Sequence, residues 1–352
     1  MRLKILLTFD HELPLGKLKT SYESALFEPT QRVLDLADRL GVKVNFFTDI
    51  LCAKQFQNWD NDDFYKPYKN QLQNALIKGH DVQLHIHPHW LTTTYKDPDY
   101  HPSRDFGLSD FKNNSEFGGI SGIIRSGIEE LNTICREVNP EYQCIAYRAG
   151  GYNIAPCTTE IFKALQAEGI LYDSSIALGY FFKSTISEVD FTKLPKKPNW
   201  FIDAENFQNS SANSGVLEIP IATIPKSPFE IPTLFKMKKY AFREPLRHGG
   251  MIHSEEKIDI ISRLKMLFAA RMLSFDNYTL SLKYLLHIVD YQVKKYKSED
   301  VLMFSVVSHP KSMSDYSFEL MEGFVREIQK KYPDVEFCTF SGLNCNQNTT
   351  KL

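Results

Sequence analysis

Short apolar segments alternate with amphipathic segments along most of the chain. Segments 3–9, 43–50 and 82–87 are short and apolar, as strands of a buried sheet are. Because short strands that alternate with helices form parallel sheets with helical crossovers, the pattern predicts an α/β fold. Further strands are predicted at 144–148, 170–173, 301–307 and 335–340, and helices at 28–40, 68–78, 121–138, 158–167 and 317–331.

The part of the chain before the strand at 301–307 follows a less regular pattern. Residues 206–215 are polar and predict a loop, whereas 216–221 (VLEIPI) predicts a strand. Residues 255–297 are rich in Lys and Arg and predict mainly helix. We therefore expect one catalytic domain over 1–345, with an inserted loop and helical region at about 181–297.

Composition and charge indicate a globular protein and give no sign of nucleic-acid binding. The chain has 352 residues, of which 43% are hydrophobic and 24% are charged, and these proportions are typical of a globular protein with a large core. Its net charge of −2 does not indicate a nucleic-acid partner. The apolar start runs directly into Asp10 and Glu12, and the six cysteines form no CxxC motif, so we expect a first strand rather than a signal peptide and a cytoplasmic location.

Ionisable residues end five of the predicted strands. Asp10, His85, Arg148, Asp173 and His309 each stand at the end of an apolar run or directly after it. Because the carboxyl ends of parallel strands meet at one edge of a sheet or barrel, we expect these side chains to lie at one rim, where active sites are built.

Three histidines in five residues indicate a metal site. His85, His87 and His89 alternate in HIHPH, so an extended chain would place them on one side, and a turn after Pro88 would still let His85 and His89 converge. Neutral imidazole is the commonest metal ligand. The alternative interpretation is a polar strand end with hydrogen-bonded histidines.

Two carboxylates in FDHE complete the candidate site. Asp10 and Glu12 share one face of a strand and His11 points away, so one carboxylate can ligate a metal while the other acts as a base. The alternative is a solvated acidic loop. Arg148 can hold a carboxylate ionised, or form a structural ion pair.

The last two candidates also have two interpretations each. Asp173 in YDSS can serve the site or cap a turn. His309 can protonate a leaving amine near neutral pH, or be a turn residue after an apolar strand.

In this order the motifs LTFDHE, HIHPH, YRAGG, YDSS and SHPK resemble those of the polysaccharide deacetylase family, also called the NodB-homology or carbohydrate esterase family 4 group. The resemblance covers about residues 3–310. It implies a distorted (β/α) barrel of about seven parallel strands, one divalent metal, most often Zn²⁺, and hydrolysis of N-acetyl groups on sugars.

The resemblance also implies a role for each matching residue. Asp10 corresponds to the general base, Arg148 to the residue that orients it, and His309 to the general acid, while His85 and His89 correspond to metal ligands. Many members carry two adjacent aspartates, but this chain has His11 at the second place. FDHE is similar to the FDVE variant, which favours Glu12 as third ligand over His11, with His87 as the other alternative. The fourth motif lacks its usual Trp, which weakens a catalytic role for Asp173.

The expected partner is an N-acetylated sugar, either an oligosaccharide or a nucleotide- or lipid-linked sugar used for O-antigen or capsule synthesis. Residues 235–271 mix basic and apolar side chains, which suggests either a helical insertion or peripheral membrane contact. The alternative functions are an amidohydrolase that acts on a non-sugar C–N bond and an inactive glycan-binding homologue. A metallophosphoesterase would need more carboxylate ligands than the motifs contain.

Overall fold

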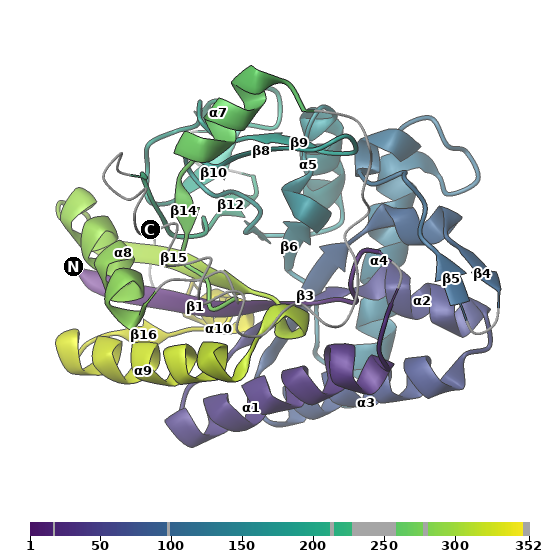
Figure 1. Cartoon of the computed structure of the whole chain (residues 1–352), viewed down its shortest axis with the longest axis horizontal. Helices are drawn as coiled ribbons and strands as arrows, with labels where there is room; N and C mark the ends of the chain where they lie inside the picture. Colours follow the sequence, from purple (N-terminus) through teal and green to yellow (C-terminus); the bar gives the residue numbers. More distant parts are fainter. Residues whose placement is uncertain (17, 97–98, 212–214, 227–257, 277–280, 348–352) are drawn as a thin grey trace.

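The computed structural model describes the chain except for residues 17, 97–98, 212–214, 227–257, 277–280 and 348–352. Residues 235–257, the larger part of the segment interpreted either as a helical insertion or as a membrane contact, therefore lie outside the described residues. Figure 1 shows a strongly curled central sheet with helices packed around its outer side.

The central sheet has ten strands in the order β11-β10-β12-β7-β6-β3-β2-β1-β15, with β16 paired to β1. All neighbours from β12 through β15 are parallel, which gives seven parallel strands. Their bounds are β1 Arg2–His11, β2 Asn45–Asp49, β3 Asp81–Ile86, β6 Ala146–Ala149, β7 Tyr172–Asp173, β12 Leu217–Glu218 and β15 Val301–Ser308. The remaining strands are β10 Trp200–Ile202 and β11 Ser210–Ser211, both antiparallel to their neighbours, and β16 Glu336–Phe337.

The residues that follow β12 close the sheet on itself. Ile221 forms parallel bridges with Ala177 and with Ser305 of β15. The Ser305 N–H donates to the carbonyl of Pro220 at 2.9 Å, and the Ala222 N–H donates to the carbonyl of Ser305 at 2.9 Å. The predicted distorted (β/α) barrel of about seven parallel strands is confirmed.

The helices bury one apolar side against the outer face of the barrel. In α1 (Glu28–Leu40) the apolar residues Val33, Leu34 and Ala37 are buried, and the helix ends at Gly41, whose φ of 65° is a left-handed conformation that glycine adopts freely. The other helices are α2 Ile50–Asn58, α3 Asp62–Ile77, α4 Gly119–Arg136, α5 Thr158–Ala167, α7 Ile260–Phe268, α8 Leu282–Lys295, α9 Asp315–Lys331 and α10 Phe340–Gln347. Small two-stranded sheets are formed by β4 Thr94–Lys96 with β5 Asp99–His101, β8 Phe181–Lys183 with β9 Glu188–Asp190, and β13 Thr223–Ile224 with β14 Arg271–Met272.

The helical insertion before the last barrel strand is present, since α7 and α8 both precede β15. Within it, residues 269–276 form an extended segment that contains β14, where the sequence predicted helix. The strand predicted at 335–340 is shorter, because β16 ends at Phe337 and Phe340 already begins α10. None of the described helices has the length and the apolar character that a bilayer span requires. The division into one domain over 1–345 stays a prediction.

Candidate active site

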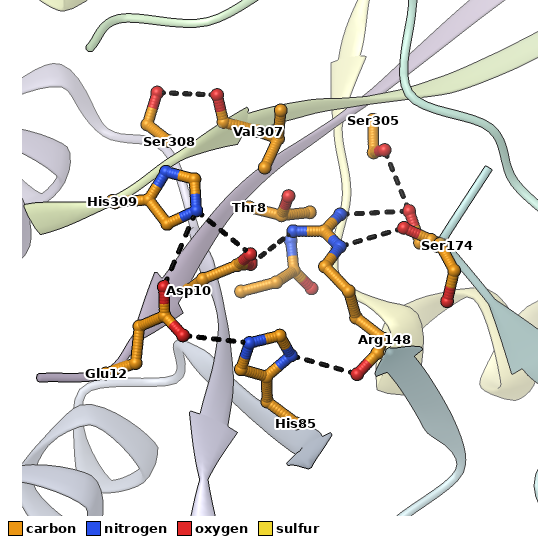
Figure 2. Close-up of polar contacts among 12 residues, drawn as sticks. Thr8, Asp10, Glu12, His85, Arg148, Ser174, Ser305, Val307, Ser308 and His309 are labelled. Atoms are coloured by element: carbon orange, nitrogen blue, oxygen red, sulfur yellow. Dashed lines mark hydrogen bonds and ion pairs between the residues drawn. The ribbon is translucent and has the colours of Figure 1, made fainter. Parts of the chain in front are cut away.

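The carboxyl ends of four parallel strands bring the predicted residues together. His85 near the end of β3 is in register with Asp49 on one side and with Arg148 of β6 on the other. Asp10 lies near the end of β1, and His309 directly follows β15, the other neighbour of β1. Figure 2 shows Asp10, Glu12, His85, Arg148 and His309 pointing toward one another inside this rim. Four of the five residues expected at a shared rim therefore lie together, whereas the fifth, Asp173, does not join them.

Arg148 holds the carboxylate of Asp10. Its Nη1 donates to Asp10 Oδ1 at 2.6 Å, and both side chains are buried. Its Nε donates to the carbonyl of Ser174 at 2.8 Å and its Nη2 to Ser174 Oγ at 3.0 Å. Burial alone would raise the pKa of Asp10, but the charges of Arg148, His85 and His309 outweigh it and lower that pKa. Asp10 is therefore ionised at neutral pH and fixed in direction.

A carboxylate and two imidazoles form a compact group of donor atoms. The donor atoms of Glu12, His85 and His87 all lie within 4.8 Å of one another, and the three residues are buried. Glu12 Oε2 lies 3.2 Å from His85 Nε2 and is also in contact with His87 Nε2. His85 Nδ1 donates to the backbone carbonyl of Arg148 at 2.9 Å, so in the neutral form of the ring that binds a metal the lone pair would lie on Nε2.

Two neighbours fix the ring of His87. A Cβ added to Gly150 would lie 2.7 Å from His87 Nδ1 and 2.4 Å from the carbonyl oxygen of Ile86, so only glycine leaves room for the ring. On the other side the ring of Phe106 lies 5.5 Å from that of His87, centroid to centroid. His87 Nδ1 has no hydrogen-bond partner among the described residues.

His89 and His11 do not join this group. Beyond β3 the chain enters a 3-10 turn over Pro88–Thr92, which carries His89 onto the ring of Phe106, with the centroids 5.7 Å apart. Neither ring nitrogen of His89 has a hydrogen-bond partner within the described part of the chain. His11 points outward as predicted, where its Nε2 lies 3.0 Å from Gln71 Oε1 and burial lowers its pKa to about 4. The geometry thus brings His87, rather than His89 or His11, to Glu12 and His85.

His309 is paired with a carboxylate that the sequence analysis missed. Its Nδ1 lies 2.8 Å from Asp276 Oδ2, and its Nε2 lies 3.5 Å from Asp10 Oδ2. Burial lowers the pKa of His309, but Asp276, Asp10 and Glu12 outweigh it and raise that pKa to about 9. His309 is therefore protonated at neutral pH. Asp276 ends the apolar run MLSF much as Asp10 ends LLTF, and this signal could have located it.

Lys311 is a second residue of the site without a predicted role. Its Nζ lies 2.8 Å from Glu12 Oε1 and donates to the carbonyl of Leu13, also at 2.8 Å. This contact occupies Oε1, the oxygen of Glu12 that does not contact His85 or His87. Oε2 is the oxygen left for His85 and His87.

Asp173 lies in a different group from the other predicted residues. Its carboxylate accepts hydrogen bonds from Ser175 N at 3.0 Å and Ser175 Oγ at 2.7 Å, and it faces Glu218, its register partner on β12. Burial raises the pKa of both Asp173 and Glu218. As the pH rises, this pair therefore loses its protons at a higher pH than two exposed carboxyl groups would. Ser175 Oγ in turn accepts from the Ala149 N–H at 2.9 Å, so Asp173 ties β7 to β6 beside Arg148.

The donor set fits one divalent metal ion. Two neutral imidazoles and one carboxylate that leave positions open for water and substrate are the ligands of hydrolytic zinc sites. The orphaned ring nitrogen of His87 and the fixed tautomer of His85 are observations that suit such an ion.

Comparisons with known proteins give the fold. No family model and no curated protein matches the sequence. A solved structure from Parabacteroides distasonis, assigned as a glycoside hydrolase/deacetylase, matches with a TM-score of 0.56 at 10% identity and covers 99% of this chain and 72% of its own. A structure assigned as a polysaccharide deacetylase from Mycobacterium smegmatis matches with a TM-score of 0.49 at 12% identity, covering 99% and 91%. The catalytic domain of a peptidoglycan N-acetylglucosamine deacetylase from Eubacterium rectale matches with a TM-score of 0.40 at 13% identity, covering 96% and 89%.

The chain shares its fold with the Parabacteroides distasonis structure assigned as a glycoside hydrolase/deacetylase. This confirms, at the level of the fold, the resemblance predicted from the five motifs. At these identities the likeness extends to the barrel and not to the chemistry, which has to be argued from the residues at its rim.

Proposed function

We propose that the protein is a metal-dependent hydrolase that removes the acetyl group from an N-acetylated sugar. The observation that carries the proposal is the arrangement of three groups around one rim: a carboxylate fixed by Arg148, a donor group of Glu12, His85 and His87, and an imidazole, His309, paired with Asp276. Hydrolysis of an amide needs a base, a means of polarising the carbonyl, and an acid, and the rim supplies a candidate for each.

Glu12, His85 and His87 would hold the ion, with zinc the metal that best suits imidazole and carboxylate ligands. A divalent ion in this position supplies Lewis-acid activation of water and of the acetamide carbonyl. Lys311 and the carbonyl of Arg148 keep Glu12 Oε2 and His85 Nε2 directed at one point, and so act as positioning groups.

Asp10 would take a proton from the attacking water through Oδ2, since Oδ1 is held by Arg148. The oxygen of that water forms the new bond to the acetyl carbon. His309 would then give its Nε2 proton to the sugar nitrogen as the C–N bond breaks, releasing acetate and a free amine. The 3.5 Å between Asp10 Oδ2 and His309 Nε2 supports these roles, because both groups would reach the same bound substrate.

The substrate, its carrier and the membrane contact that the sequence suggests are part of the same proposal. The acetylated sugar would be an oligosaccharide or a sugar linked to a nucleotide or lipid carrier, used in making a surface polysaccharide inside the cell. In the described part of segment 235–271, α7 exposes the large apolar side chains of Ile260, Ile261, Leu264 and Phe268, and these suit the alternative of contact with a lipid surface.

The proposal is tested by measuring metal content and acetate release together. We expect purified protein to bind one zinc ion per chain and to release acetate from at least one member of a panel of N-acetyl sugars, UDP-N-acetyl sugars and N-acetylated oligosaccharides. Chelation should abolish the release and added zinc should restore it. Stoichiometric zinc without release from any sugar would favour an amidohydrolase of a non-sugar C–N bond, and absence of bound metal would favour an inactive glycan-binding protein.

A further inference from the structure

One buried carboxylate beside the candidate metal ligands has no part in the proposed reaction. Asp49 is the last residue of β2, is 1% exposed, and belongs to none of the five motifs that predicted the site. It is in register with His85 on the neighbouring strand β3, so it lies at the same edge of the sheet. A buried carboxylate is costly unless its oxygens accept hydrogen bonds, so the partners of Asp49 indicate what it holds in place.

Both oxygens of Asp49 bind the segment that follows β3. Oδ1 accepts the backbone N–H of His87 at 3.3 Å, and Oδ2 accepts the indole N–H of Trp90 at 2.7 Å. In the sequence these two donors flank Pro88 and His89, where the chain leaves β3 for the 3-10 turn. One carboxylate therefore spans the turn, and we call this pair of hydrogen bonds the Asp49 clamp.

Both ends of the Asp49 clamp are held by further buried side chains. The backbone carbonyl of Asp49 accepts the hydroxyl of Tyr68, which is fully buried on α3, at 2.9 Å. The side chain of Trp90 is 1% exposed, and its ring packs against those of Phe56 and Tyr100 with centroids 5.8 and 5.2 Å apart. Movement of either end would leave a buried polar group unpaired or open a cavity, so the turn is fixed in one position.

The Asp49 clamp bears on which imidazole meets Glu12. While the backbone N–H of His87 is bound to Asp49, the ring of His87 contacts Glu12 through Nε2. The turn held by the clamp takes the ring of His89 to that of Phe106 instead, with the centroids 5.7 Å apart. Carboxylates beside metal-ligating histidines commonly accept from the free ring nitrogen and so fix the tautomer. Asp49 accepts from the backbone, so it fixes where the ring is carried.

We propose that Asp49 is the positioning residue that makes His87, and not His89, the second imidazole of the metal site. The inference rests on the proposed metal-dependent function and deepens it, because it assigns the choice of ligand to a residue outside the donor group. Asp49 acts on the metal only through the position of His87. Once the clamp is broken, removal of the His87 ring should therefore have little further effect on metal affinity.

The test combines Asp49→Asn with His87→Ala and measures zinc affinity by competition with a chromogenic chelator. Asn keeps the size of the side chain but has one acceptor oxygen in place of two, so it cannot accept both hydrogen bonds of the clamp. Trp90→Phe is a second variant, which removes the indole N–H and keeps an aromatic ring. Asp81→Asn is the matched control, because Asp81 is also buried, at the opposite end of β3, where it accepts from Ser341.

We expect Asp49→Asn and Trp90→Phe each to lower zinc affinity by about ten-fold, while Asp81→Asn matches the wild type. His87→Ala should lower the affinity of the Asp49→Asn chain by less than about two-fold further, but should keep its full effect in the Asp81→Asn chain. If the losses from Asp49→Asn and His87→Ala are additive, Asp49 does not act through His87 and the proposal is overturned.

The position of the His87 ring is also measured without metal, from the NMR signals of its ¹⁵N-labelled imidazole. Asp49→Asn and Trp90→Phe should shift these signals, and Asp81→Asn should leave them unchanged. Unchanged signals in both clamp variants would overturn the inference even if the wild type binds zinc and releases acetate. Shifted signals in a protein that binds no zinc would support the clamp, and the proposed metal site and reaction would then fail alone.

Discussion

The carboxylate of Asp276 lies against His309 on two sides: Oδ2 is 2.8 Å from Nδ1 of the ring, and Oδ1 accepts the backbone N–H of His309 at 2.9 Å. This double contact fixes the ring so that Nε2 points at Asp10 and Glu12. It also requires a proton on Nδ1, so that the proton available for transfer is the one on Nε2. Asp276 is therefore a positioning residue for the proposed acid.

The pH dependence of kcat/KM should show the effect of Asp276 on the pKa of His309. The pKa of His309 is raised to about 9, so the donor form is complete at neutral pH and is lost as the pH rises through about 9. Asp276→Asn removes the carboxylate that raises this pKa, so the alkaline limb of the kcat/KM profile should move to lower pH. Asp290→Asn, which removes an exposed partner of Lys331, should leave the limb in place. A limb that Asp276→Asn does not move would exclude His309 as the acid.

The role of Asp10 as the base is tested by the variant Asp10→Asn. Asp10→Asn keeps the size of the side chain and an oxygen for Arg148 but cannot accept a proton, so kcat should fall by ~10²–10⁴-fold. Because Asp10 is not in the donor group of Glu12, His85 and His87, the variant should still bind one metal ion. Turnover at the wild-type rate would remove Asp10 from the mechanism, and loss of the metal would make it a ligand instead.

The metal ligands are distinguished by two histidine variants. His87→Ala should lower zinc affinity by ~10-fold or more, since it removes a donor that contacts Glu12. His89→Phe keeps a ring that can stack on Phe106 and removes nitrogens that have no hydrogen-bond partner among the described residues, so zinc affinity should be kept. Competition with a chromogenic chelator measures both. The opposite result would make His89 the ligand, as the family motif implies.

The barrel and the residues at its rim could be predicted from the sequence, because both depend on the local spacing of apolar residues. Short apolar runs set the parallel barrel, and parallel strands place Asp10, His85, Arg148 and His309 at one rim whatever the details of the loops. The choice between His87 and His89 could not be made in this way. It depends on where β3 ends, because the 3-10 turn that begins at Pro88 takes His89 to the ring of Phe106 and away from Glu12.

The residues that were missed depend on contacts between distant parts of the chain. Lys311 reaches Glu12 across 299 positions, and nothing in SHPK specifies that contact. The apolar run before Asp276 could have marked it as a candidate, but its contact with His309 depends on an extended segment where basic and apolar composition predicted helix. Glu218 meets Asp173 only because β12 and β7 pair in one particular register. Such contacts follow from tertiary packing, which composition and periodicity do not encode.

Gly150 should be indispensable for the metal site. A methyl group there would overlap the His87 ring and the Ile86 carbonyl, so Gly150→Ala should displace the ring and lower zinc affinity by ~10-fold. Gly41→Ala is the matched control, because Gly41 has a φ of 65° but no atom within 4 Å of an added Cβ. It should cost about 1 kcal/mol of stability and leave zinc affinity unchanged. Equal zinc affinity in the two variants would refute the packing argument.

The buried pair of Asp173 and Glu218 should make the protein less stable as the pH rises. Burial raises the pKa of Glu218 well above its ordinary value of 4.5, so the folded chain keeps a proton that the unfolded chain releases. The stabilising effect of that proton is complete below the unfolded pKa and is lost as the pH rises toward the folded one. Gln resembles the protonated carboxyl and does not titrate, so Glu218→Gln should gain stability relative to the wild type between about pH 5 and about pH 8.

Urea unfolding at the two pH values measures the difference, with Glu322→Gln, an exposed residue paired with Arg326, as the control that should show little change. If the difference between wild type and Glu218→Gln were the same at both pH values, Glu218 would not be the group that keeps a proton in the folded chain.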